Sequence, residues 1–119
     1  MSANSQSLEI GSSITPDDSR IDTPEKRLLF QSLTQKLLSH VSEINFNTRH
    51  NVIMHINSHK INEISVEVYW YVDGKNDKQE KPATDYHAGY YWLSSEKISK
   101  WFRDVHIGLD LLVAENKAA

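Results

Sequence analysis

The segment EISVEVYWYVDG, which runs from Glu63 to Gly74, alternates apolar and polar residues with the period of a β-strand. Because successive side chains of a strand point to opposite faces of a sheet, the alternation separates two sets of residues. The set expected to face a core is Ile64, Val66, Val68, Trp70 and Val72. The other set is Glu63, Ser65, Glu67, Tyr69 and Tyr71. The pattern predicts a long strand near Asn62–Val72 whose second face carries two tyrosines.

Two neighbouring segments are also rich in β-branched and aromatic residues and predict further strands. The first, near His50–Asn57, would place Val52, Met54 and Ile56 inward and Ile53 and His55 outward. A helix is the alternative for residues 50–57, although the nearby asparagines favour a strand. The third strand is expected over about Asp85–Leu93. Its alternation assigns Ala88, Tyr90 and Trp92 to the inner face, and His87, Gly89, Tyr91 and Leu93 to the outer face.

Helical patterns flank the three predicted strands. Thr23 and Pro24 form a helix start, and leucines then recur every four residues, which predicts a helix from Pro24 to about Val41. Ser94, Ser95 and Glu96 cap a second helix. Its apolar stripe steps by four and three residues through Ile98, Phe102, Val105, Leu109 and Leu112. Gly108 lies inside this stripe and predicts close packing or a bend there.

The predicted order of elements is helix, strand, strand, strand, helix. It favours an α+β domain over residues 23–119, with a three-stranded antiparallel meander and both helices on one face of the sheet. Residues 1–22 are rich in Ser, Asp and Asn and lack a regular apolar period, so we expect a mobile, disordered tail. Partial ordering of this tail against the domain, or against a neighbouring subunit, is the alternative. The segment KNDKQEKPATD predicts a solvated loop.

Composition excludes several classes of protein. The chain has 119 residues, a net charge of −3 and no cysteine, so disulfides, thiolate metal sites and cysteine nucleophiles are absent. No apolar run approaches the ~18 residues of a membrane span, and the first residues do not resemble a signal peptide. We therefore expect a cytoplasmic protein that is not associated with a membrane.

The sequence contains no motif that indicates catalysis or a cofactor. Its six histidines do not form an HExxH pair, and on a strand His55 and His59 would be separated by about 13 Å of rise. Its four glycines are not clustered as in a phosphate-binding loop, and a GxSxG nucleophile motif is missing. We expect a non-enzymatic protein without a metal or small-molecule cofactor.

The outer face of the predicted sheet is the candidate binding site. It would gather aromatic, histidine and aliphatic side chains, namely Ile53, His55, Tyr69, Tyr71, His87 and Tyr91. A sheet face of this composition is typical of a surface that contacts a partner, and we expect a second copy of the same chain. The alternative is that cross-strand aromatic pairs simply stabilise the sheet.

Nucleic-acid binding is the competing functional hypothesis, because tyrosines on a sheet can stack bases. The order of elements also resembles that of double-stranded-RNA-binding domains. The resemblance is limited to the order: the second helix of such domains opens with a lysine-rich segment, whereas here it opens SSEKISK. Glu63 and Glu67 on the tyrosine face would also repel phosphates. Nucleic acid is therefore not the expected partner.

Overall fold

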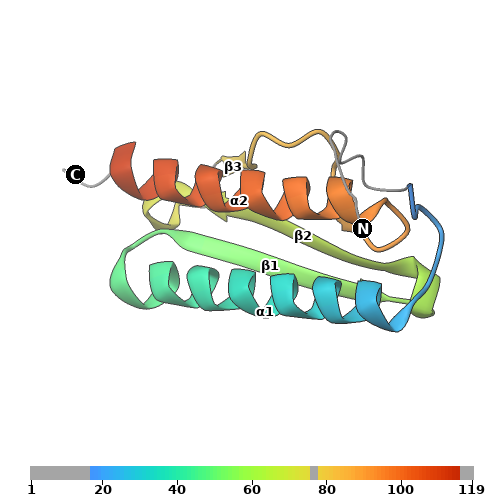
Figure 1. Cartoon of the computed structure of the whole chain (residues 1–119). Coiled ribbons are helices and arrows are strands. Elements are labelled where there is room, and N and C mark those ends of the chain that lie inside the picture. Colours follow the sequence, from blue (N-terminus) through green and yellow to red (C-terminus); the bar gives the residue numbers. More distant parts are fainter. Residues whose placement is uncertain (1–16, 76–77, 116–119) are drawn as a thin grey trace, which may run out of the picture.

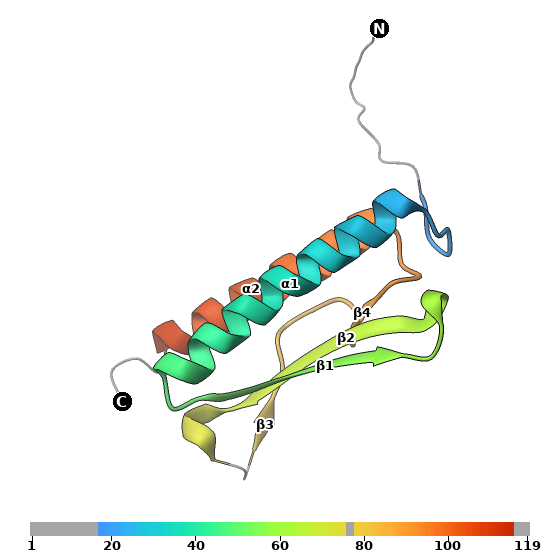
Figure 2. The same ribbon diagram turned by 90° about the horizontal axis from the view of Figure 1, so that it is seen from below.

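The computed structural model describes residues 17–75 and 78–115 and has two layers. Helices α1 (Pro24–Asn47) and α2 (Ser95–Glu115) run side by side in the same direction and cover one face of an antiparallel sheet (Figures 1 and 2). Its strands are β1 (Asn51–Ser58), β2 (Ile64–Tyr71), β3 (Gln79–Glu80) and β4 (Gly89–Tyr90). Short 3-10 turns, η1 (Ile61–Glu63) and η2 (Val72–Gly74), flank β2. The predicted α+β fold is confirmed.

Helix α1 begins where the sequence predicts and ends later. The hydroxyl of Thr23 accepts a hydrogen bond from the backbone N–H of Lys26, which caps the first turn. The helix continues past Val41 to Asn47 because Ile44 extends the buried stripe by another turn. It ends at Thr48, whose backbone is extended.

Strands β1 and β2 form the longest ladder of the sheet. Their register pairs Val52 with Trp70 and His55 with Glu67. Residues 50–57 are therefore strand rather than helix apart from His50, and β2 separates its faces as predicted. Val66, Val68 and Trp70 are buried on the side of the helices, whereas Tyr69 and Tyr71 are half-buried on the other side.

The third strand predicted over Asp85–Leu93 is wrong as a continuous element, because only Gly89–Tyr90 pairs with β2. Hydrogen bonds bend the chain on both sides of this pair. The indole of Trp101 donates to the carbonyl of Tyr86, and the N–H of Leu93 bonds back to the carbonyl of Tyr90. Part of the predicted solvated loop forms β3 instead, which pairs with the other end of β2.

The faces assigned to the third strand are corrected as well. Tyr91 was expected on the outer face, but it is 2% exposed and packs edge-to-face on Phe30, with 5.5 Å between ring centroids. Tyr90 is paired with Ser65 on the outer face, and its ring stacks on Trp92. Ala88 is buried as predicted.

The core lies between the helices and β2. It contains the predicted stripe of α2 together with Trp101, and Tyr91 and residues of α1, β1 and β2 complete it: Phe30, Leu37, Val41, Ile44, Val52, Val66, Val68 and Trp70. Gly108 allows the close contact that the sequence predicts, since a Cβ there would lie 3.1 Å from Cβ of Pro82. The segment before β4 therefore packs directly on α2.

One side chain of α1 satisfies the edge of the sheet. The amide of Asn45 donates to the carbonyl of Val52 over 2.9 Å and accepts from its N–H over 2.8 Å. β1 is an edge strand, and these two groups of Val52 would otherwise point away from β2 without a partner. Asn45 thus takes the place of one residue of a further strand.

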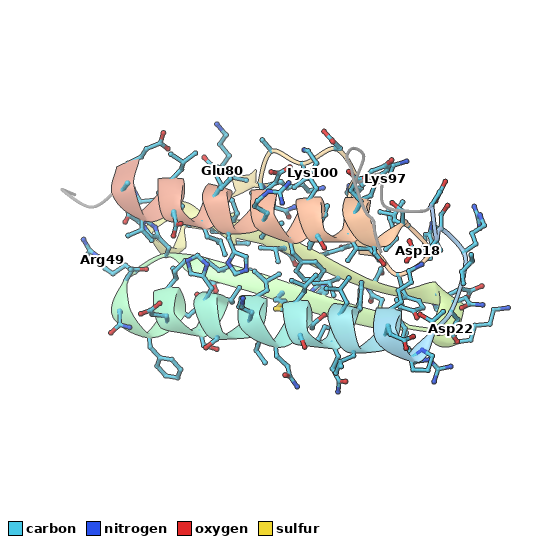
Figure 3. The ribbon with its side chains drawn as sticks, viewed as in Figure 1. Asp18, Asp22, Arg49, Glu80, Lys97 and Lys100 are labelled. Atoms are coloured by element: carbon cyan, nitrogen blue, oxygen red, sulfur yellow. The ribbon has the colours of Figure 1, made fainter. Side chains whose placement is uncertain are left out.

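Residues 17–22, the described part of the predicted tail, bond to both helices; residues 1–16 lie outside the described residues. Asp18 accepts hydrogen bonds from the N–H and the hydroxyl of Ser95 at the start of α2. The ammonium of Lys26, 2% exposed, donates to the carbonyls of Asp18 and Ile21. Figure 3 shows Asp18 and Asp22 beside the first turns of the helices, far from Arg49 at the opposite end.

Candidate functional site

The face of the sheet opposite the helices is covered by no other described element (Figure 2). Strand β1 contributes Ile53 and His55 to this face, and β2 contributes Tyr69 and Tyr71. The register places Ile53 directly opposite Tyr69, and His55 opposite Glu67. The structure therefore brings together these predicted site residues, which we call the outer-face cluster: Ile53, His55, Tyr69 and Tyr71.

The rings of the outer-face cluster contact one another in a row along the sheet. His55 and Tyr69 meet edge-to-face with 5.5 Å between centroids, and Tyr69 and Tyr71 do so at 6.2 Å. The hydroxyl of Tyr71 donates to the side-chain oxygen of Gln79 on β3 over 3.4 Å. Edge-to-face pairs contribute roughly 0.5–1.5 kcal/mol beyond area burial. The row is therefore held in place before any partner arrives.

The other two predicted site residues do not join this cluster. Tyr91 lies in the core, and His87 is exposed in the irregular segment before β4. Strict alternation failed here because it requires a continuous strand, and β4 has only two paired residues. Buried Gly89 was a signal of the irregularity, since a Cβ at this position would lie 2.6 Å from the Trp101 ring.

An open hollow of about 730 Å³, which no sequence pattern indicated, lies at the η1 end of the sheet. Asn57 and Ser65 are cross-strand partners at its floor, and the indole of Trp92 borders it. The remaining lining is polar: Arg20, His59, Lys60, Asn62 and Glu63. Lys60 forms an ion pair with Glu63 over 3.5 Å, so much of the charge in the hollow is already compensated.

The side chains of this face offer both apolar area and polar groups to a partner. The rings and the aliphatic side chain of Ile53 can bury apolar area. His55 can donate a hydrogen bond, and the carboxylate of Glu67, its cross-strand partner, can accept one. In the part of the chain that the structure describes, no group of three or more His, Asp or Glu side chains is arranged to hold a metal ion.

The chain matches no protein-family model, no curated protein and no solved structure. Within residues 17–75 and 78–115, neither helix combines the length and the apolar character that crossing a membrane requires.

Proposed function

We propose that this protein is a non-enzymatic interaction module that binds a second copy of itself through the outer-face cluster. The observation that carries the proposal is the continuous row of rings formed by exposed His55 and half-buried Tyr69 and Tyr71, on a sheet face that no described helix covers. Aromatic side chains anchored in this way are typical of the energetic centre of an interface.

A second copy suits this face because the face carries groups that can pair with one another across a twofold axis. A twofold dimer places the same patch on both subunits, so each residue meets its counterpart or a neighbour of that counterpart. His55 and Glu67 lie opposite each other on adjacent strands. Rotation by the twofold axis can set the His55 of one copy against the Glu67 of the other, while the tyrosine rings pack at the centre.

The test is the mass of the protein in solution, measured by sedimentation or light scattering at tens of micromolar. We expect a dimer for the parent chain and at least a tenfold weaker dimer for the double variant Tyr69→Ala, Tyr71→Ala, since truncation at interface centres typically costs about 2 kcal/mol or more. The circular dichroism of the helices should not change, because both rings lie outside the core.

Phe46→Ala is the matched control, because Phe46 is an aromatic residue of α1 that is 88% exposed on the other layer. This variant should associate as the parent does. A monomeric parent would refute self-association, and dissociation caused by Phe46→Ala alone would move the interface to the helical layer.

Binding of single-stranded nucleic acid is the second candidate. The hollow beside the outer-face cluster favours it, because the Trp92 ring and the side chains of Arg20 and Lys60 line the same space. This candidate predicts salt-sensitive quenching of tryptophan fluorescence by a short oligonucleotide. Unchanged fluorescence at low salt would remove it.

A further inference from the structure

Two histidines join the helices on the layer that the proposed dimer does not use. Nδ1 of His40 on α1 lies 2.7 Å from Nδ1 of His106 on α2, and the two rings are nearly parallel. Nε2 of His40 lies 3.2 Å from a carboxylate oxygen of Asp110. Nε2 of His106 is buried, and it has no hydrogen-bond partner among the described residues.

This geometry determines where the protons lie in the neutral pair. A carboxylate only accepts, so Asp110 favours the proton of His40 on Nε2. Nδ1 of His40 is then an acceptor, and the hydrogen bond between the rings requires His106 to donate from its own Nδ1. Nε2 of His106 is left as a lone pair, which is less costly to bury than an N–H without an acceptor.

An additional proton has no favourable position in this arrangement. If it binds His106, it must occupy the buried Nε2, where no described group accepts it. If it binds Nδ1 of His40, two N–H groups oppose each other across 2.7 Å unless the proton of His106 moves to Nε2. Both routes that keep the hydrogen bond end with the same unsatisfied N–H on His106.

The surrounding charges do not remove this penalty. Lys36 and Glu43 of α1 line the same hollow as the two histidines, and Asp110 projects from α2. Burial lowers the pKa of His106, and the nearby His40 lowers it further; Asp110 acts in the opposite direction and Lys36 in the same direction.

We propose that His40 and His106 form a neutral, proton-sharing clasp between α1 and α2 that opens on acidification. Because folded His106 resists protonation while unfolded histidine binds a proton at pH ~6.5, folding stability falls as the pH drops below about 6.5. The loss continues until the pH has passed the lowered pKa of His106. The clasp does not depend on self-association through the outer face.

Nuclear magnetic resonance of the imidazole nitrogens in the parent protein tests the clasp directly. At pH 7 we expect His40 as the Nε2–H tautomer and His106 as the Nδ1–H tautomer. His106 should titrate below the ordinary histidine range. An Nε2–H tautomer of His106, or titration of His106 with the ordinary midpoint, would overturn the proposal. This readout requires no variant to fold.

Thermal unfolding at pH 7.5 and pH 5.5 provides the second test. We expect the melting temperature of the parent to fall by roughly 4–8 °C, the shift typical of a modest loss of stability in a domain of this size. His106→Phe keeps a ring and removes the titration, so its loss should be less than half as large. His59→Gln, in the exposed β1–β2 turn, is the control and should behave as the parent. Equal losses in all three proteins would refute the clasp.

Zinc ions at one equivalent distinguish a proton clasp from a metal site. The clasp predicts no change in the melting temperature of the parent. Stabilisation of the parent by zinc that is lost in His106→Phe would assign the pair to a metal and overturn the proposal.

Discussion

The phenol of Tyr91 donates a 2.7 Å hydrogen bond to Asp22, 69 positions earlier in the chain. The same carboxylate accepts two bonds, of 2.8 and 2.6 Å, from the guanidinium of Arg27. A ring of the core, the first turns of α1 and the segment before that helix are thereby joined at one carboxylate. The arrangement fixes how the N-terminal segment enters the domain.

The bonds at this carboxylate should persist to an unusually low pH. The hydrogen bonds from Arg27 and Tyr91 lower the pKa of Asp22 to about 2. Because the pKa is depressed in the folded state, the stabilisation is present above the unfolded value near 3.9 and is lost as the pH falls through about 2. A carbon-13 titration of the Asp22 carboxyl should show this midpoint, and Arg27→Gln should raise it. A midpoint near 3.9 in the parent would contradict the geometry.

Removal of the Asp18 side chain should weaken the start of α2. Asp18→Ala deletes two bonds to Ser95, and loss of such a cap costs about 0.5–2 kcal/mol. Urea unfolding measures the change. Asp17→Ala is the matched control, because the described bonds of the Asp17 carboxylate reach only Ser19 in the same exposed segment. Equal effects of the two substitutions would show that Asp18 does not cap the helix.

Asn45→Ala should destabilise the protein more than its exposed position suggests. The substitution leaves an N–H and a carbonyl of Val52 without their partners beside the core, at a cost of about 1–3 kcal/mol. Asn47→Ala, which deletes one bond to the carbonyl of Glu43 in the same helix, should change the free energy of unfolding by less than about 0.5 kcal/mol. A reversed order would indicate that water replaces Asn45 without loss.

Gly89→Ala should be costly because the Cβ would come within 2.6 Å of the Trp101 ring. Overpacking of this kind typically costs about 1–3 kcal/mol. Gly108→Ala offers a comparison. Its Cβ would lie 3.1 Å from Cβ of Pro82, and alanine stabilises a helix by about 1 kcal/mol relative to glycine. Chemical unfolding should therefore rank Gly89→Ala as clearly the less stable variant.

The spacing of apolar residues and the helix-capping residues were sufficient to predict both helices and the division of β2 into two faces. They work because Thr23 and the stripe of α2 act locally, and because every inward residue of β2 meets the same core. The outer-face cluster followed from the same alternation in β1 and β2, and its role as an interface stays a prediction.

The parts that the sequence did not predict depend on contacts distant in the chain. Tyr91 is turned inward by the irregular backbone around Gly89, which the indole of Trp101 shapes from α2. No local pattern in the sequence indicates that His40 and His106, 66 positions apart, share a hydrogen bond. Pairings of this kind arise only once both helices occupy the same face.

Because Lys26 is buried beneath residues 17–22, the reactivity of its amine reports whether this segment is docked on the domain. Its ammonium lies between two carbonyls of the N-terminal segment and 5.0 Å from the centre of the Tyr91 ring. Acylating reagents need an accessible amine, and this amine is buried while residues 17–22 stay in place. Lys26 should therefore be modified far more slowly than the exposed Lys36 or Lys100, and the rate of its modification counts how often the N-terminal segment detaches.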